Sequence, residues 1–335
     1  MKITMNDVAR ESGVSKATVS YVLNNRQSLF GISNRTVTRV LDTVKRLNYK
    51  VDPAAVLLSE KKNDIVSILL LSPWLHAQFS SFMVQVSSAV EEMSRNYKLK
   101  ISYEMYREGE LKHTLRSSKY KKFDAIMVMG TQMEDDAFLA KNSSKFSNVV
   151  LLNRHVEGFP CVCGNDQKGA ANLASKIAAR NYYDRYLVIT HPVMSRLERM
   201  RVAGYLEGLK SIDPDRVELI ECLQSPADPE TSDAFFDSMY GKRTACFEVQ
   251  YYPGAMLLAQ AARRGFSIPD EIGVAAYDRH SIIENILTHE LTTVDPRIEE
   301  MTKEAVLMCF ELKNGKKPQS RQILSETIPG NSMVY

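Results

Sequence analysis

The chain has 335 residues, 44% of them hydrophobic and 25% charged, a composition typical of a globular protein with two or three domains. No apolar run approaches the ~20 residues that cross a bilayer, and no secretory leader opens the chain, which argues against membrane and secreted proteins and for a cytoplasmic location. Residues 1–62 hold 11 Lys and Arg against 5 Asp and Glu, a net charge of +6, whereas the remainder holds 32 against 35, a net charge of −3. A basic module on a slightly acidic body indicates binding to nucleic acid.

Residues 6–23 have the spacing of two short helices joined by a tight turn. Gly13 stands where the chain must reverse, because glycine reaches positive φ at no steric cost, and Ser15 is placed to cap the second helix. Val19, Val22 and Leu23 recur at i, i+3 and i+4, the stripe of an amphipathic helix. This pattern predicts a helix-turn-helix, whose second helix enters the major groove of DNA. The alternative is an ordinary helical hairpin.

A third helix and a linker follow this motif. Ser33 can cap a helix whose apolar stripe completes a three-helix core: Val37, Val40, Leu41, Val44 and Leu47. Asp52 and Pro53 can begin a short helix over residues 54–58, which is below the ~12–15 residues that make an isolated helix stable in water. The sequence therefore predicts a DNA-binding domain over 1–49, a linker over 50–62 and a body over 63–335.

The body alternates between strand and helix patterns. Buried parallel strands are expected at 65–71, 125–129, 149–152, 186–189, 245–247 and 272–276. Helices are expected between them at 82–97, 111–120, 169–180, 197–209, 229–240 and 254–264, and again at 298–312. This order predicts an α/β body of two doubly wound parallel-sheet lobes, with ligands bound beyond the carboxyl ends of the strands.

Cysteine usage predicts reduced thiols. The five cysteines are scattered and odd in number: Cys161, Cys163, Cys222, Cys246 and Cys309. Cys161 and Cys163 share one face of a strand-like run, but no third ligand is near them in sequence, so we expect no metal site there. The six histidines have no metal-ligand spacing either, and no cofactor is expected.

Taken together, these segments resemble the lactose-repressor/galactose-repressor (LacI/GalR) family over nearly the whole chain. The resemblance is carried by the head segment TMNDVARESGVSKATVSYVL (4–23) and by body segments in the family's order: LNR (152–154), GNDQKG (164–169), RMRVAGY (199–205), IPDEIG (268–273), Tyr277-Asp278 and LTTVDP (291–296). The family implies a periplasmic-binding-protein-like body, with one lobe over 63–162 and 292–322 and the other over 163–291 and 323–335. It also implies a homodimer that binds a palindromic operator, and residues 327–335 contain no leucine heptad for a tetramer.

The resemblance places Lys16, Ala17 and Tyr21 at base edges, and Thr18 and Ser20 at phosphates. Thr4, Ser15, Asn24 and Ala55 join them at the DNA interface, and Leu58 is the apolar wedge of a hinge helix in the minor groove. Tyr21 replaces the family's usual Arg, so either the operator differs or Tyr21 packs on the sugar-phosphate edge. Leu57 is an alternative wedge, and a flexible tether without DNA contact is the alternative to the hinge helix.

For the effector, the resemblance points to Arg199 and Asp278, whose donors and acceptors suit a sugar or another polyol; a salt link between them across an empty cleft is the alternative. Arg154, Gln250 and Tyr251 are further candidates, and Gln250-Tyr251 replaces the family's Asn-Asp. The segment after the first strand also departs from the family, so Trp74, His76 and Phe79 become candidate contacts.

The leading hypothesis is a DNA-binding transcription repressor that a small molecule controls from the interlobe cleft. Control by a protein partner and a solute-binding module are the alternatives. An enzyme is not expected, since the sequence has no Walker-type loop, no GxGxxG after a strand and no GxSxG.

Overall fold

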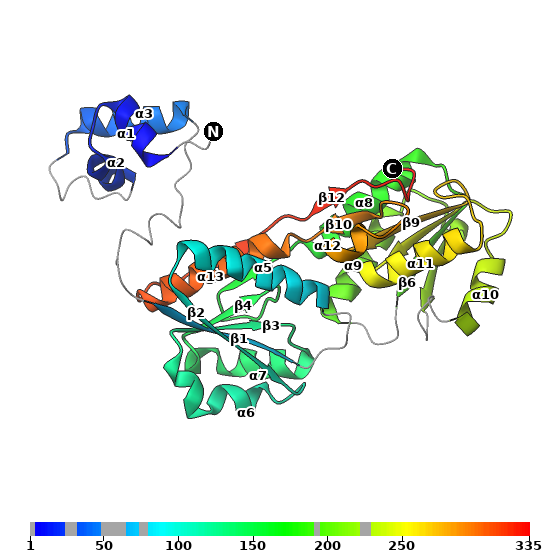
Figure 1. Cartoon of the computed structure of the whole chain (residues 1–335), viewed down its shortest axis with the longest axis horizontal. Helices are drawn as coiled ribbons and strands as arrows, with labels where there is room; N and C mark the ends of the chain where they lie inside the picture. The colour runs from blue at the N-terminus through cyan, green and yellow to red at the C-terminus, as the bar shows by residue number, and fades with distance from the viewer. Residues whose placement is uncertain (1–3, 24–31, 48–64, 74–79, 191–194, 222–228) are drawn as a thin grey trace. The chain divides into compact units, whose positions relative to one another are not determined.

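The computed structural model describes residues 4–23, 32–47, 65–73, 80–190, 195–221 and 229–335. The chain divides into two units, residues 1–64 and 65–335. The first contains the helices drawn in blue in Figure 1, and the second is the α/β body. The predicted linker and its hinge helix lie outside the described residues. Within the described residues, no helix is long and apolar enough to span a membrane.

The first unit has three helices: α1 (Met5–Ser12), α2 (Lys16–Leu23) and α3 (Asn34–Arg46). Thr4 and Asp7 form a reciprocal capping box at the start of α1. Gly13 ends α1 in the left-handed conformation with φ 63°, as its position in the turn requires. Ser15 Oγ accepts a hydrogen bond from the Thr18 N–H at 3.1 Å, and Ser33 Oγ accepts one from the Thr36 N–H at 3.3 Å. Local capping therefore sets the start of all three helices.

The core of the first unit follows the predicted stripes, with one exception. Val8, Val19 and Val40 are fully buried and Val22 is nearly so. Partly buried side chains pack around them: Met5, Val14, Leu23, Ile32, Val37, Val44 and Leu47. Leu41 was expected in this stripe but is 41% exposed. One residue turns a helix by about 100°, so with Val40 at the centre of the buried face Leu41 lies at its edge.

Each half of the body is built on a six-stranded sheet. The first has the order β11-β5-β4-β3-β1-β2, with bounds β1 (Val66–Pro73), β2 (Leu99–Tyr106), β3 (Ala125–Met129), β4 (Val149–Leu152), β5 (Cys161–Cys163) and β11 (Arg321–Gln322). The second has the order β12-β10-β9-β8-β6-β7, with bounds β6 (Arg185–Thr190), β7 (Val217–Glu221), β8 (Thr244–Glu248), β9 (Ile272–Tyr277), β10 (Thr292–Asp295) and β12 (Glu326–Ile328). All pairs are parallel except β10 with β12.

Helices cover both faces of each sheet, which confirms the doubly wound α/β lobes. In the first lobe, α5 (Ser80–Asn96) and α13 (Ile298–Lys313) lie on one side, and α6 (Leu111–Arg116) and α7 (Met133–Asn142) lie on the other (Figure 1). In the second, α8 (Asp166–Arg180) and α9 (Arg196–Gly208) pack on one face, and α10 (Pro229–Asp237) and α11 (Tyr251–Arg263) on the other. Short helices complete the body: η2 (Ser118–Lys122), η3 (Ser143–Lys145), η4 (Pro214–Arg216) and α12 (Ser281–Glu284).

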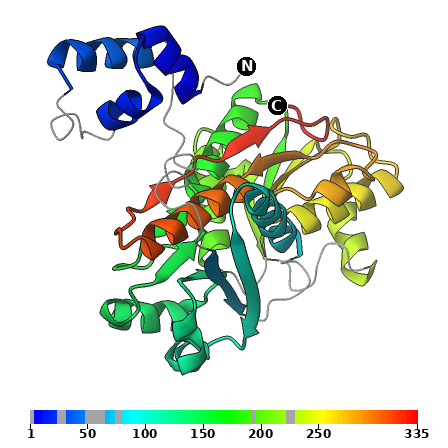
Figure 2. The ribbon, with the colours of Figure 1, turned by 60° about the vertical axis from the view of Figure 1, so that its left-hand side comes forward.

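The chain passes between the two lobes at three places: after β5, between β10 and α13, and between β11 and β12. The last crossing is the red segment that runs from one lobe into the other in Figures 1 and 2. The return to the first lobe was expected at residue 292, and this is wrong. Residues 292–295 form β10 and pair with β9, because Thr292, Thr293 and Val294 are all buried inside the second sheet before the chain crosses.

Helices α8 and α9 approach each other closely through glycines. A Cβ built on Gly204 would lie 2.1 Å from the Gln167 carbonyl oxygen and 2.8 Å from Ala170 Cβ. We expect Gly204→Ala to lower the free energy of unfolding by about 1–3 kcal/mol, because overpacking outweighs the better helix propensity of alanine. Urea denaturation measures the change.

Ala203 is the matched control, since it is exposed on the same helix. Ala203→Gly should cost only the helix-propensity difference of about 1 kcal/mol. A Gly204→Ala variant that is more stable than the wild type contradicts the close packing.

Candidate functional site

The DNA-facing candidates of the first unit begin at the amino-terminal turn of α2. Lys16 is its first residue and is exposed. The hydroxyls of Thr4, Ser15 and Thr18 already serve in caps: Thr4 Oγ1 donates to Asp7 Oδ2 at 2.6 Å, and Ser15 Oγ and Thr18 Oγ1 lie 2.9 Å apart. A hydroxyl that holds a helix start is presented in a defined orientation, which suits a phosphate contact.

The other predicted DNA contacts are described in part or not at all. Ala17, Ser20 and Tyr21 belong to α2, but their side chains lie outside the described part of the chain. Asn24, Ala55 and Leu58 lie outside it entirely. Exposed basic side chains of α3 add positive charge to this unit: Arg35, Arg39, Lys45 and Arg46. Of these, Arg46 pairs with Glu11 at 3.2 Å.

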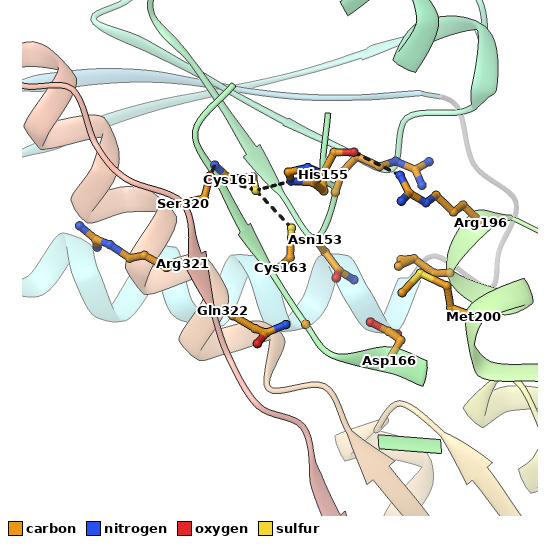
Figure 3. Close-up of a pocket in the computed structure, with 13 residues that line it drawn as sticks. Asn153, His155, Cys161, Cys163, Asp166, Arg196, Met200, Ser320, Arg321 and Gln322 are labelled. Carbon is orange, nitrogen blue, oxygen red and sulfur yellow. Dashed lines mark hydrogen bonds between the residues drawn. The ribbon is translucent and has the colours of Figure 1, made fainter. Parts of the chain in front are cut away.

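In the body, a cavity of about 370 Å³ opens where the lobes meet beside the crossings. Its walls come from both lobes: Asn153, Arg154, His155, Cys161, Cys163, Gly164, Asp166, Arg196, Leu197, Met200, Ser320, Arg321 and Gln322. Figure 3 shows Arg196 reaching toward His155, where Arg196 Nη1 donates to the His155 carbonyl oxygen at 3.3 Å. A second contact between lobes runs from Gln85 Nε2 to the Arg279 carbonyl oxygen at 3.3 Å.

Arg201 of α9 is the central charge of the second lobe. Its guanidinium binds both Asp278 oxygens at 2.8 and 2.9 Å, Asp166 Oδ1 at 3.0 Å and the Val249 carbonyl oxygen at 2.8 Å. The guanidinium also stacks over the Tyr277 ring, 4.1 Å from its centre. Burial lowers the pKa of Arg201, but the negative charges of Asp278 and Asp166 raise it by more than burial lowers it. The pKa of Arg201 is therefore above its ordinary value, and the group stays cationic.

The alternative of a salt link between Arg199 and Asp278 is wrong: among the described residues, Arg201 is the partner of Asp278. Two residues turn a helix by about 200°, so Arg199 and Arg201 lie on opposite faces of α9. Arg201 is 5% exposed, whereas Arg199 is exposed. Arg201 lies within RMRVAGY but was not among the predicted contacts, because two arginines two residues apart do not reveal from sequence which one faces the core. Asp278 itself has φ 76°, a conformation rare outside glycine that recurs at functional sites.

Arg154 connects the first lobe to the cavity. Its Nε donates to Thr131 Oγ1 at 2.9 Å and lies 3.4 Å from Asp136 Oδ2. Burial lowers the pKa of Arg154, Asp136 raises it, and the charges of Arg196 and Arg199 from the second lobe lower it further. Its Nη1 is buried and has no hydrogen-bond partner among the described residues. One donor at the cavity is therefore left for a bound group.

Further buried polar atoms without hydrogen-bond partners lie at or just after the carboxyl ends of strands β8 and β9 in the second lobe. Within the described residues, these are both carboxyl oxygens of Glu248, Gln250 Oε1, the Tyr251 hydroxyl and His280 Nδ1. Gln250 Nε2 donates to Glu198, and the rings of Tyr251 and His280 lie 6.3 Å apart. Burial also raises the pKa of Glu248 well above its ordinary value. Unpaired buried polar groups are rare in native proteins and call for an unseen partner.

The structure brings together some of the predicted effector contacts. Gln250, Tyr251 and Asp278 follow β8 and β9, at the carboxyl edge of the second sheet, and Arg154 follows β4 in the first. Of the predicted effector contacts that the structure describes, only Arg154 lines the cavity beside the crossings. Trp74, His76 and Phe79 lie outside the described residues. The described residues hold no group of three or more His, Cys, Asp or Glu side chains that could bind a metal ion.

Comparison with known proteins matches both parts of the chain. Residues 4–52 match the family model "Bacterial regulatory proteins, lacI family", and residues 187–333 match "Periplasmic binding protein-like domain". Among the relatives, the transcriptional regulator GalS of Salmonella typhimurium is 26% identical over 92% of this chain and 89% of its own length. The Bacillus subtilis ribose operon repressor is 27% identical, covering 92% and 90%.

Solved structures have the same fold. A lac repressor dimer bound to operator and the anti-inducer ONPF matches with a TM-score of 0.63 and 16% identity over all of both chains. A complex of the regulator CelR with cellobiose matches with a TM-score of 0.60 and 18% identity, covering 99% of this chain and 100% of that one. A helix-turn-helix unit joined to two such lobes defines a bacterial transcription regulator. The chain is a DNA-binding transcriptional regulator of the lacI family.

Proposed function

We propose that this regulator binds a palindromic operator as a homodimer and represses transcription, and that a small polyhydroxylated molecule in the interlobe cleft controls it. The main support for an effector is a set of buried polar atoms at the carboxyl ends of the strands that have no hydrogen-bond partner among the described residues. Arg154 Nη1 belongs to one lobe, and the atoms of Glu248, Gln250 and Tyr251 belong to the other. Ligands of open α/β sheets bind at this edge. No catalytic step is part of this role.

The chemistry of these groups supports a sugar or a sugar derivative. Arg154 donates, Gln250 Oε1 accepts, and the Tyr251 hydroxyl does both, as hydroxyl groups of a ligand require. Arg199, on the exposed face of α9, is a further proposed contact of the effector. Two similar proteins are consistent with such a ligand: one is a ribose operon repressor, and the other is a regulator solved in complex with cellobiose.

An effector bound in the cleft controls the protein only if it binds two lobe arrangements with different affinity. The three crossings are where such arrangements differ, because they alone carry the backbone from one lobe to the other. We propose that the effector selects one arrangement and thereby changes the geometry that the dimer offers to its operator.

At the operator, we propose that Lys16, Ala17 and Tyr21 of α2 contact base edges, which is supported by the position of Lys16 as the exposed first residue of that helix. Thr4, Ser15, Thr18, Ser20 and Asn24 are proposed phosphate-side contacts, and Ala55 and Leu58 contact the minor groove. Such a protein works in the cytoplasm, where bacterial DNA is found.

The test is selection of bound sequences from random duplex DNA by the full-length protein at a stated salt concentration. We expect a palindromic motif with a pyrimidine–purine step at its centre, where a duplex kinks most easily. The variant Lys16→Ala should lose about 1–3 kcal/mol of binding free energy and relax the preference at one base pair of each half-site.

Lys45→Ala is the matched control, since Lys45 is an exposed lysine of α3 outside the helix-turn-helix. It should weaken binding to all sequences alike. Binding without any motif and with a steep salt dependence contradicts the proposal, because the first unit would then bind phosphate alone.

A further inference from the structure

The wall of the cavity carries two thiols that the regulatory function does not use. Cys161 and Cys163 project from the same face of β5, and their sulfur atoms lie 3.4 Å apart (Figure 3). His155 Nδ1 lies 3.5 Å from Cys161 Sγ, and Ser320 Oγ lies 3.4 Å from it. All four residues line the cavity. Cys163 is half-buried and Cys161 is 2% exposed, so the cavity is the route by which a small reagent reaches the pair.

The two thiols differ in proton affinity. The Cys163 thiol donates a hydrogen bond to Cys161 Sγ, which, with Ser320 and His155, lowers the pKa of Cys161 to about 5. The same hydrogen bond, together with burial, raises the pKa of Cys163 above its ordinary value. Charged side chains that face the cavity beside them are Arg154, Arg196, Arg321 and Asp166. At neutral pH this gives one thiolate with a protonated thiol next to it.

We propose that Cys161 and Cys163 form a peroxide-reactive dithiol, in which Cys161 is the nucleophile and Cys163 the resolving thiol. Residues i and i+2 of a strand are about 6.6 Å apart at Cα, within the range that a disulfide spans. The thiolate of an accessible cysteine is the form that peroxides oxidise, and an adjacent thiol turns the product into a disulfide.

The chemistry takes two steps. The Cys161 thiolate attacks one oxygen of a hydroperoxide, the O–O bond breaks, and the alkoxide or hydroxide leaves and takes up a proton. Sulfur is oxidised by two electrons to a sulfenic acid and the peroxide is reduced. Cys163 Sγ then attacks Cys161 Sγ, the S–O bond breaks, and the Cys163 proton leaves with the hydroxide as water. An external dithiol reverses the disulfide by exchange.

The place of the pair links it to the crossings. Cys163 is the last residue of β5 before the first crossing, and its carbonyl oxygen accepts a hydrogen bond from Ile323 N at 2.9 Å, next to the third. Closing the sulfur atoms from 3.4 Å to the ~2.05 Å of a disulfide shifts β5 against β11. Oxidation therefore acts on the same segments as the effector, an extension that rests on the proposed function.

The test oxidises full-length protein with hydrogen peroxide in a Cys222→Ser background, which leaves the four cysteines that the structure describes. We expect two of four thiols to be lost, and the tryptic peptide spanning 155–168 to become lighter by two hydrogens. Cys163→Ser should stop at a sulfenic acid that dimedone traps on Cys161, and Cys161→Ser should show neither product. Cys309→Ser is the control, since burial raises the pKa of that thiol and it is fully buried.

The pH profile separates this site from an ordinary thiol. The oxidation rate of Cys161 should stay level from pH 8 to pH 6 and halve near pH 5, whereas an ordinary thiol slows about tenfold per unit below its pKa of ~8.5. The proposal is overturned if all four thiols are retained, if the oxidation rate of Cys161 has the pH dependence of an ordinary thiol, or if the disulfide forms between two chains.

Coupling to DNA is tested by operator binding before and after peroxide, with Cys161→Ser as the unreactive control. A change in affinity that only the wild type shows supports the coupling, and equal affinity before and after overturns it. The thiol measurements need no DNA, so failure of the dithiol and failure of the proposed regulation are distinguished.

Discussion

Deleting residues 1–64 should abolish specific operator binding, with a loss of at least about 1,000-fold, because specific protein–DNA complexes exceed non-specific binding by that factor or more. The deleted part holds the helix-turn-helix and the net positive charge of the chain. The remaining residues, 65–335, form a unit with its own buried cores in both lobes. Fluorescence anisotropy with a labelled operator measures the loss.

The body should retain its other properties after this deletion. Its unfolding midpoint in urea should match that of the body in the full chain, and any sugar that raises the full chain's melting temperature should raise that of the fragment equally. A fragment that is folded but has lost the response to such a sugar contradicts the modular interpretation. So does a fragment that still selects the operator.

Replacing Arg201 by methionine should lower the free energy of unfolding by about 3–5 kcal/mol, because it leaves the buried Asp166 carboxylate and the half-buried Asp278 carboxylate without their cation. Asp166 is 1% exposed, and Asp278 has Arg201 as its bidentate partner. Methionine preserves much of the apolar stem that packs on Tyr277, so the loss reports mainly on the charges. Urea denaturation followed by circular dichroism measures it.

Arg199→Met is the matched control for stability, since Arg199 is exposed on the same helix two residues earlier. Surface substitutions of this kind stay within about 0.5 kcal/mol. The double variant Arg201→Met/Asp278→Asn should be more stable than the sum of the single changes predicts, because the second change removes one unpaired charge. An effect of Arg201→Met no larger than that of Arg199→Met contradicts the central role of the buried network.

The hydrophobic pattern of the sequence predicts the central strands of both sheets. The strands expected from apolar runs are all present, since each lies inside a sheet and is buried on both faces. Five strands were missed: β2, β7, β10, β11 and β12, of which all but β10 lie at a sheet edge. Except for Tyr106, the side chains of β2 and β7 are exposed or partly buried, so these two strands contain Lys100, Glu104, Glu218 and Glu221 and do not read as apolar runs.

Features that depend on near neighbours follow from the amino-acid sequence alone. The caps at Ser15 and Ser33 and the turn at Gly13 rest on contacts within four residues, and the stripe of Val19 and Val22 follows from the helical repeat; the structure confirms each. The same holds for the succession of strands and helices, because periodicity is a local property of the chain.

Which distant groups meet depends on tertiary packing. It paired Asp278 with Arg201 across 77 residues, placed β10 in the second sheet and brought Ser320 to Cys161 across 159 residues. Each contact depends on how sheets and helices pack, and a shift of two residues along α9 exchanges a buried guanidinium for an exposed one. Local patterns carry no information about such long-range choices, because the free energy that decides them comes from burial and charge pairing in the assembled core.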